Sequence, residues 1–575
     1  MDEELRAAEA HIRRLEEELL RLKDVKRELE QLREDHQRLR RSVEGRVAKV
    51  LSASFRMFGS KRNVPAELTE YERWLARHRV AGDELPRLRE EARAFVYQPL
   101  VSVLMPTFKP NEVWLRAAID SVRAQAYENW ELLIVDDGSP RVSEALQQNE
   151  DARIRVFLEK QHGGISAALN VALSHARGDW IALLDHDDLL EPDAIFRAVE
   201  LLQFDRPADV IYSDEDKIID DHFAAPMLKP DWSPDFFLTH DYLGHFVVMR
   251  RGFVDEFRSE FDGAQDYDLL LRVAEQTKRI RHIPRVLYHW RRTAESTAHN
   301  IRRKPGALEA GRSAIKQHLR RRRIDGRVTI DWETHAYRVR RRVAPTKVAI
   351  VLLDGDAEAS ASIRERTAYP NFEVVSEPAA LLDLQAEMLL FLQIGLEPVS
   401  ADWLSILAEY AQSEKIGAVA PRILADDATV ETAGLVLLPG GEIRNAFAGV
   451  ARDFRGANRQ LQTVRNYSAI SGAGLMTRRE VLQKIAFPRA AGLLAFARND
   501  DLCTCVEFCL KLRDAGLRVV SVPYAELRRS LPQTPSARSC PELAQRWPEA
   551  FARDPFYHPN LSRDRGDFSL GEAQP

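Results

Sequence analysis

Short apolar segments alternate with amphipathic stretches from residue 100 onward, and this alternation restricts the fold more than any other feature of the chain. Residues 101–105 and 131–135 are apolar runs of strand length, separated by a stretch with helical periodicity. Further strand-like segments follow at 154–158 and 180–184, with helical patterns between them. Strands and helices that alternate at these lengths predict an α/β domain built on a parallel sheet.

A second strand–helix series begins near residue 347, after an arginine-rich joint, and parts of it repeat the first. The segment Tyr127–Glu131 (YENWE) returns as Tyr369–Glu373 (YPNFE). The pattern of residues 265–288 returns at 504–527. A pattern that occurs only twice predicts a duplicated domain rather than a solenoid.

These patterns divide the 575 residues into six predicted parts. The last part is rich in proline, arginine and polar residues, so we expect it to be a loosely packed tail. The six parts are a coiled coil (1–45), a helical, amphipathic connector (46–98), a catalytic α/β domain (99–325), a basic linker (326–345), a degenerate second copy of that domain (346–531) and the tail (532–575).

The first 62 residues predict two helical features. Apolar residues recur in steps of three and four through residues 3–43, with one slip near Leu22 and Val25. A helix of this length needs a partner for its apolar stripe, so we expect self-association; the alternative is a single charged helix folded back on the body. Residues 46–62 form a basic amphipathic stretch that either contacts an anionic membrane surface or docks on the next domain.

Composition excludes several classes of protein. The net charge of −5 argues against nucleic acid as the main partner. No apolar run approaches the ~20 residues that span a bilayer, and the charged N-terminus is not a secretory signal. We therefore expect a cytoplasmic protein, with peripheral contact at the inner face of the membrane as an alternative. The four cysteines cannot form a disulfide framework, and Cys503, Cys505 and Cys509 are expected to be buried thiols in a reducing compartment.

An acidic turn directly after the fourth strand is the strongest chemical signal. Asp185, Asp187 and Asp188 lie within four residues and repel one another unless a cation or a network compensates them. A hard divalent ion with oxygen ligands would do so, although an acidic turn that only caps the next helix is the alternative. Asp266, just before an amphipathic helix, is free to face a cleft as a base. His289, near the end of a later strand, could offer a neutral imidazole to a metal or be structural.

Eight segments together resemble the inverting glycosyltransferases of family 2. These are VSVLMPTFKP, ENWELLIVDDGS, GGISAALNVAL, ARGDWIALLDHDDLLEPDAI, YSDEDKI, KPDWSPDFF, GAQDYDLLLR and HIPRVLYHWR. The set is most similar to the bacterial two-domain members that build O-antigen and other surface polysaccharides. The resemblance implies the GT-A nucleotide-sugar-binding fold, here duplicated with a degenerate second copy.

The resemblance also implies a role for each matching position. The nucleotide would be held by Pro106, Thr107, Asp137 and Asp185, with Arg291 beside the diphosphate; Mg²⁺ or Mn²⁺ would be held by Asp185, Asp187 and His289; Asp266 would be the catalytic base. Gly164 departs from the family pattern, in which a bulkier polar residue is usual.

The second copy lacks this chemistry. The segment Gln393–Gly395 stands where the first copy has its Asp185–Asp187 pair, and Cys505 stands at the position of Asp266. Arg528 or Arg529 replaces the histidine. We therefore expect a non-catalytic second domain.

The predicted activity is the transfer of a sugar, with inversion, from a nucleotide-diphosphate sugar to a glycan or lipid-linked glycan acceptor. Two alternatives stay open: a bifunctional polysaccharide polymerase with two active sites, and a coiled-coil scaffold of a glycan assembly complex with vestigial catalysis. Such a displacement requires a metal that assists the departure of the diphosphate and a base that accepts the proton of the acceptor hydroxyl.

Overall fold

The computed structural model describes residues 68–571, with gaps at 148–149, 206, 293–304, 353–354, 377–383, 457–458, 486–501 and 531–537. The predicted coiled coil (1–45) and amphipathic stretch (46–62) lie outside the described residues. The chain forms two compact units, and all described residues except 80–85 belong to one of them. Within that unit we call residues 99–325 the first module and residues 346–531 the second module.

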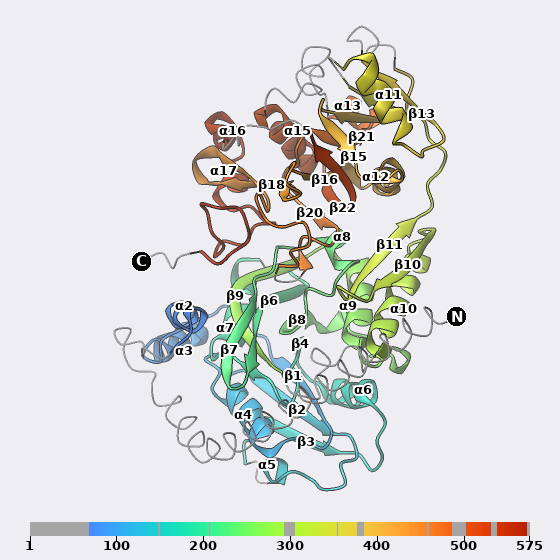
Figure 1. Ribbon diagram of the computed structural model, residues 1–575. Coiled ribbons are helices and arrows are strands. Elements are labelled where there is room, and N and C mark those ends of the chain that lie inside the picture. Colours follow the sequence, from blue (N-terminus) through green and yellow to red (C-terminus); the bar gives the residue numbers. More distant parts are fainter. Residues whose placement is uncertain are drawn as a thin grey trace, which may run out of the picture. The chain divides into compact units, whose positions relative to one another are not determined.

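The first module is built on a nine-stranded sheet with the order β3-β2-β1-β4-β8-β6-β9-β5, in which β7 pairs with β6 (Figure 1). Strands β3, β2, β1 and β4 are parallel neighbours, as are β6 and β9. The strands are β1 (Val101–Thr107), β2 (Trp130–Asp136), β3 (Ile154–Leu158), β4 (Trp180–Leu183), β5 (Leu189–Leu190), β6 (Val210–Ile219), β7 (His222–Met227), β8 (Val247–Arg250) and β9 (Ile280–Arg291).

The sheet is mixed rather than parallel, which corrects the sequence-based expectation. Strand β8 lies antiparallel between β4 and β6. The connection from β7 to β8 contains only the one-turn helix α8 (Pro234–Phe237), too short for the crossover that parallel neighbours require. The sequence predicted parallel strands from the helices between them, and this connection contains no helix long enough to cross the sheet.

Helices cover the sheet with the apolar faces that the sequence pattern predicts. In α4 (Glu112–Arg123), the Asn111 side chain caps the N-terminus by accepting the Val113 N–H at 3.0 Å, and Leu115, Ile119 and Val122 are buried. The other helices of this part are α2 (Glu70–His78), α3 (Leu85–Arg93), α5 (Glu144–Gln147), α6 (Ile165–His175), α7 (Ala194–Phe204), α9 (Gln265–Gln276) and α10 (Pro305–Arg321).

The predicted basic linker is a folded β-hairpin. Strands β10 (Gly326–Asp331) and β11 (Ala336–Arg341) pair antiparallel along their full length. Val328, Tyr337 and Val339 join the core of the first module. Among the neighbouring arginines, Arg327 is exposed, whereas Arg338 and Arg340 are half-buried. The arginine-rich segment that suggested a linker is thus part of a two-stranded sheet.

The second module repeats the strand order of the first. Its order is β13-β12-β14-β21-β16-β22-β15, with the same strand directions as β2-β1-β4-β8-β6-β9-β5. Among the described residues, no strand flanks β13 as β3 flanks β2. The strands are β12 (Val348–Val351), β13 (Phe372–Val375), β14 (Met388–Leu392), β15 (Leu396–Pro398), β16 (Ile416–Leu424), β17 (Val430–Thr432), β20 (Arg465–Asn466), β21 (Gly474–Arg478) and β22 (Arg518–Arg529).

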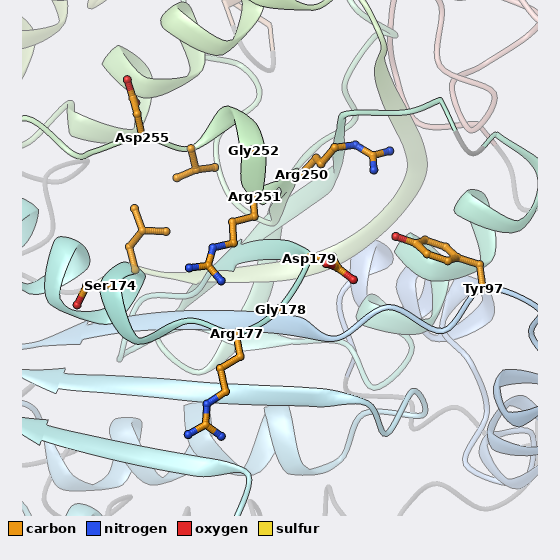
Figure 2. Close-up of a pocket in the computed structure, with 11 residues that line it drawn as sticks. Tyr97, Ser174, Arg177, Gly178, Asp179, Arg250, Arg251, Gly252 and Asp255 are labelled. Atoms are coloured by element: carbon orange, nitrogen blue, oxygen red, sulfur yellow. The ribbon is translucent and has the colours of Figure 1, made fainter.

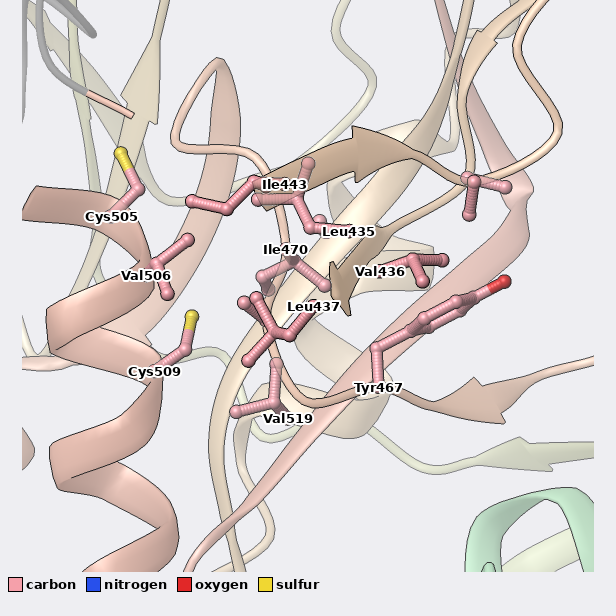
Figure 3. Packing of buried hydrophobic residues seen from close by; sticks show 14 of the residues in the cluster. Leu435, Val436, Leu437, Ile443, Tyr467, Ile470, Cys505, Val506, Cys509 and Val519 are labelled. Carbon is pink, nitrogen blue, oxygen red and sulfur yellow. The ribbon is translucent and has the colours of Figure 1, made fainter. Parts of the chain in front are cut away.

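A small sheet and several helices complete the second module and the chain end. Helix α15 packs Cys505, Val506 and Cys509 against the apolar side chains of this sheet, among them Leu437 (Figure 3). The sheet consists of β18 (Leu435–Leu438), β19 (Glu442–Asn445) and β23 (Arg538–Ser539), and the helices are α11 (Ala357–Glu365), α12 (Trp403–Ala411), α13 (Arg479–Lys484), α15 (Leu502–Asp514), α16 (Pro541–Arg546) and α17 (Pro548–Ala552).

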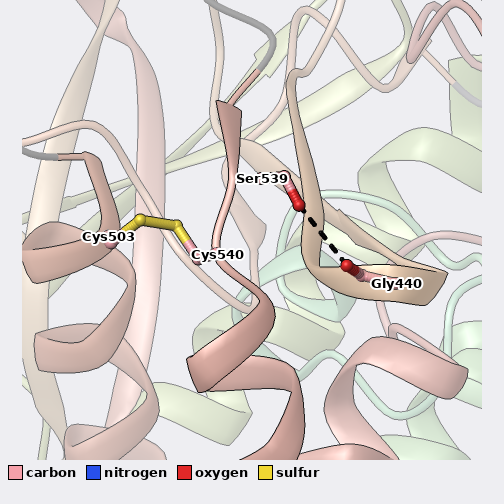
Figure 4. The surroundings of a disulfide bond; sticks show 4 residues. All are labelled: Gly440, Cys503, Ser539 and Cys540. Atoms are coloured by element: carbon pink, nitrogen blue, oxygen red, sulfur yellow. Dashed lines mark hydrogen bonds between the residues drawn. A yellow bond between two sulfur atoms is a disulfide. The ribbon is translucent and has the colours of Figure 1, made fainter.

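Residues 538–571 are packed, so the expectation of a loose tail is wrong for them. Phe551, Tyr557 and Leu561 are buried in the same core as α15. Cys540 forms a disulfide with Cys503, with Cα atoms 5.9 Å apart, and so ties the start of α16 to the start of α15 (Figure 4). Cys503 was expected to be a thiol; its partner is 37 residues away in sequence and no local pattern marks the pair.

In the part of the chain that the structure describes, no helix combines the length and the apolar character that crossing a bilayer requires.

Candidate active site

Three parallel strands bring the predicted site residues to one edge of the first sheet. Strands β1 and β2 end together, with Thr107 opposite Asp136. The chain after β4 continues this register, because the Leu184 N–H donates to the Leu104 carbonyl at 3.1 Å, and the turn of Asp185–Asp188 follows. In open α/β sheets, ligands bind beyond the carboxyl ends of such strands.

Two buried oxygens at this edge have no hydrogen-bond partner in the part of the chain that the structure describes. They are Thr107 Oγ1 and Asp136 Oδ2, and both residues are at most 2% exposed. A buried polar atom without a partner is costly unless a ligand satisfies it. Thr107 was predicted here. Asp136 was missed because the sequence argument chose the second aspartate of the Asp136–Asp137 pair.

Asp137 instead organises the entrance to α6. Its carboxylate accepts the N–H groups of Gly163 (2.7 Å) and Gly164 (2.9 Å), while its own N–H donates to the Thr107 carbonyl at 2.8 Å. Gly164 has φ +94°, and a Cβ there would lie 2.5 Å from the Asp262 carboxylate. The departure from the family pattern at Gly164 therefore has a steric reason.

The acidic turn is held in shape by Asp188 and Arg291. The Asp188 carboxylate accepts the Arg291 N–H at 2.7 Å and the Tyr288 hydroxyl at 2.5 Å, and the Arg291 Nε–H donates to the Asp187 carbonyl at 2.9 Å. Burial, reinforced by Asp187 and Asp185, raises the pKa of Asp188 well above its ordinary value. Asp188 and Arg291 thus fix the loop from which Asp185 and Asp187 project.

Asp185 lies close to other negatively charged carboxylates. Burial, together with the charges of Asp187 and Asp266, raises its pKa. Ligating atoms of Asp185, Asp188 and His245 lie within 4.8 Å of one another. Carboxylate oxygens with one imidazole form a suitable donor set for a divalent cation, so these residues fit the metal that the resemblance implies.

His245 is a site residue that the sequence argument missed. Its backbone N–H donates to Glu215 Oε2 at 2.9 Å and its ring stacks on Tyr288 with centroids 4.9 Å apart. Although burial alone would lower it, the carboxylates of Glu215, Asp188 and Asp185 raise the pKa of His245 to about 10. A histidine in a loop offered no sequence signal, because its partners come from β6 and the acidic turn.

The structure does not bring His289 to the Asp185–Asp187 pair, contrary to the expectation that it ligates the metal. Its Nδ1 lies 2.6 Å from Asp216 and its Nε2 2.6 Å from Glu191, so both ring nitrogens are engaged. Side chains alternate along a strand, and Tyr288 already faces the acidic turn. The ring of His289 is thus held by Asp216 and Glu191, and these carboxylates, against the effect of burial, raise its pKa to about 9.

Asp266 was expected just before the helix but lies in the first turn of α9, where its Oδ1 accepts the Tyr267 N–H at 2.8 Å. A second carboxyl group, on Asp241, interacts electrostatically with Asp266. Burial and the charge of Asp266 raise the pKa of Asp241 to about 8, and Asp241 Oδ1 is a buried atom with no hydrogen-bond partner among the described residues. Asp185, Asp241 and Asp266 thus line one site, in which Asp241 was missed because it lies in an irregular loop.

A pocket of about 860 Å³ lies at the opposite edge of the sheet (Figure 2). Gly178 and Asp179, just before β4, and Arg251 and Gly252, just after β8, line it. Because β4 and β8 are antiparallel, both segments lie at the edge where β4 begins, away from the acidic turn. This pocket is separate from the candidate active site.

Comparison with known proteins agrees with this geometry. The family description "Glycosyl transferase family 2" matches residues 102–258. A Sinorhizobium fredii protein, y4gI, is 33% identical over 85% of this chain and 60% of its own length. The O-antigen biosynthesis protein RfbC of Myxococcus xanthus is 30% identical over 88% of this chain and 44% of its own length. The chain thus spans about half the length of these curated relatives.

Among solved structures, Staphylococcus aureus TarS in complex with UDP-GlcNAc is similar over 38% of this chain and 66% of that one, with 19% identity and a TM-score of 0.33. The matched residues 102–258 contain β1, β2, β4 and the acidic turn of the site. The first module therefore contains a segment, residues 102–258, that matches glycosyltransferase family 2.

Proposed function

We propose that the first module transfers a sugar, with inversion and with Mg²⁺ or Mn²⁺, from a nucleotide-diphosphate sugar to a glycan or lipid-linked glycan in the synthesis of a bacterial surface polysaccharide. One observation carries the proposal. The Asp185–Asp187 pair, the partnerless oxygens of Thr107 and Asp136, and the carboxyl groups of Asp241 and Asp266 line the same edge of the sheet.

The donor end of this arrangement suits a nucleotide diphosphate. Thr107 and Asp136 offer hydrogen-bonding oxygens to the base or ribose. Asp185 and Asp187 would hold the cation, with His245 as the nearest imidazole, and a bound cation would supply Lewis-acid stabilisation of the departing diphosphate. Arg291 keeps the acidic turn in place and adds positive charge beside it.

The acceptor end suits a single displacement. The acceptor hydroxyl oxygen forms a bond to the anomeric carbon as the bond from that carbon to the diphosphate oxygen breaks. Asp266 takes the hydroxyl proton, which requires a carboxylate within hydrogen-bond reach. Asp241, buried beside Asp266, is placed to orient the sugar that carries this hydroxyl.

We infer that the second module arose by duplication and is not catalytic. Its strands follow the order of the first, but Gln393–Gly395 follows β14 where Asp185–Asp187 follows β4. Cys505 is fully buried in α15, so it cannot replace Asp266. Arg529 is paired with Glu431 at 2.5 Å. These features oppose a polymerase with two active sites.

Self-association through residues 1–45 and a peripheral membrane contact through residues 46–62 stay predictions. RfbC, whose name refers to O-antigen biosynthesis, supports the substrate class. The intact acidic site opposes a scaffold with vestigial catalysis as the whole account.

The test is donor hydrolysis and transfer by the purified protein with Mn²⁺ and a panel of nucleotide sugars. We expect turnover of at least one donor, loss of it with EDTA, and loss in the double variant Asp185→Asn, Asp187→Asn. Asp266→Asn should lose transfer by a factor of about 10² or more while donor binding stays measurable. The exposed Asp325→Asn is the control. Turnover that survives both EDTA and Asp266→Asn would exclude this mechanism.

A further inference from the structure

A second set of polar groups lies on the same face of the sheet as the site, beyond His245. The ring of Trp290 lies 5.1 Å from that of His245 and 5.1 Å from the ammonium of Lys217. In the β6–β9 register, Lys217 is opposite Trp290 and Glu215 is opposite Tyr288. Because side chains alternate, Lys217 projects to the face that carries the acidic turn.

The second module contributes an arginine to this end of the site. The Arg459 guanidinium donates to the His335 carbonyl at 2.9 Å and lies 3.1 Å from His335 Nδ1. Arg459 and His335 have φ angles of 55° and 56°, a left-handed conformation that costs energy for residues other than glycine. The position of Arg459 is therefore set by both its backbone and its hydrogen bonds.

The loop that begins at His240 lies beside the segments that carry both cations. The Lys229 ammonium joins Glu215 (2.8 Å), which shares a face of β6 with Lys217, to the Leu243 carbonyl (2.6 Å). The Tyr337 N–H, two residues after the His335 that binds Arg459, donates to the Thr239 carbonyl at 2.8 Å.

Burial and the charges of Arg292 and Arg459 lower the pKa of Lys217, despite the opposing charge of Glu215. Burial, with Arg459 and Lys217 nearby, lowers the pKa of His240 to about 3, so its imidazole is neutral. Among the ion pairs of the described residues, neither Lys217 nor Arg459 has a carboxylate partner within 4.0 Å.

This set adjoins the acceptor end of the site. His240 directly precedes Asp241, whose pKa is raised by the charge of Asp266. The loop that carries both is fixed, because Tyr242 and Leu243 are buried and the Lys229 ammonium donates to the Leu243 carbonyl at 2.6 Å. The positive charges therefore lie beside the carboxyl groups that would receive the acceptor hydroxyl, not beside the nucleotide.

We propose that Lys217 and Arg459, with the neutral imidazole of His240, bind an anionic group of the acceptor, a phosphate or a carboxylate. A residue of the second module then completes the acceptor end of the first module's site. Lys217 and Arg459 are partly desolvated cations without a carboxylate partner among the described residues. A bound oxyanion would compensate their charges through charge-assisted hydrogen bonds. This inference rests on the proposed function, because it takes Asp266 to be the base.

The test is calorimetric titration of the full chain in EDTA with inorganic phosphate, glucuronate and glucose. We expect at least one anion to bind and glucose not to bind. Arg459→Gln and Lys217→Gln should each weaken anion binding about tenfold, the loss of roughly one charge-assisted hydrogen bond, whereas Arg459→Lys should weaken it less. Arg528→Gln is the matched control, because Arg528 is an exposed arginine of the same module.

Equal anion binding in wild type, Arg459→Gln and Lys217→Gln would overturn the proposal, as would the absence of binding by both anions. Binding of phosphate alone assigns a phosphorylated acceptor, and binding of glucuronate assigns an acidic sugar; either supports the proposal. EDTA removes the metal and no donor is present, so this result is independent of donor turnover. The proposed function can thus fail in the turnover assay while anion binding persists. Anion binding can likewise be absent while donor turnover is observed.

Discussion

At the scale of single residues, strand alternation decides which histidine faces the acidic turn. His289 is adjacent in sequence to Tyr288 and Trp290, yet its two ring nitrogens bind Asp216 and Glu191. His245 comes from a loop and lies against Asp185 and Asp188. The residue type at the end of β9 was recognisable from the sequence, but the face to which it points depends on register.

Two matched variants separate these histidines. His245→Gln should weaken Mn²⁺ binding by about tenfold, because it removes an imidazole beside the acidic turn. His289→Gln should leave Mn²⁺ affinity nearly unchanged but lower the melting temperature, because it removes one partner from each of two buried carboxylates. Mn²⁺ titration followed by electron paramagnetic resonance, together with thermal unfolding, checks both. The opposite assignment of the two effects would restore His289 as the metal ligand.

At the scale of elements, sequence periodicity predicted the strands whose ends are determined by nearby residues. The strands that end at Thr107, Asp136 and Leu183 were recognisable, because each is an apolar run that ends in a polar turn. The antiparallel β8 was not, because its partners β4 and β6 are distant in sequence. The hairpin β10–β11 was not, because its arginine-rich composition suggested a linker. The same limit applied to Asp241 and His245, which enter the site through the loop between α8 and β8.

The disulfide between the starts of α15 and α16 makes a prediction at this scale. In denaturant without reductant, thiol titration should find two reactive groups per chain, Cys505 and Cys509, and four after reduction. Cys503→Ser should then leave three thiols, because it releases Cys540. Reduction should also lower the melting temperature, because the bond closes a loop in the unfolded chain. Four thiols in protein purified under oxidising conditions would contradict the pairing.

At the scale of the whole molecule, the last described residues bind the first module. His558 donates from Nε2 to Asp214 at 2.7 Å, and Arg553 pairs with Asp231 at 2.6 Å. The Asn560 N–H donates to His558 Nδ1, which leaves the proton of a neutral imidazole on Nε2. His282 contacts Asp214 from β9 at 2.9 Å. Composition suggested a loose tail, because composition does not reveal contacts between residues more than 300 positions apart.

The buried contact between Asp214 and His282 makes the free energy of unfolding depend on pH, and the sign of each contribution follows from the pKa shifts. Although burial alone would raise it, His558 and His282 hold the pKa of Asp214 below its ordinary value, so this contribution exists above pH ~4 and is lost on acidification. Asp214 and Asp231 raise the pKa of His282 against the effect of burial. That contribution is complete below pH ~6.5 and is lost as the pH rises through the folded value.

Asp214→Asn should therefore destabilise the protein most between pH ~4 and ~6.5, by about 3 kcal/mol, because it leaves the charge of His282 without its buried partner. The difference in unfolding free energy from wild type should narrow at higher pH, where His282 becomes neutral, and at lower pH, where Asp214 gains a proton in wild type. Urea unfolding across this range measures it, with the exposed Asp325→Asn as control. A deficit that is equal at every pH would mean that Asp214 contributes packing and hydrogen bonds but no ion pair.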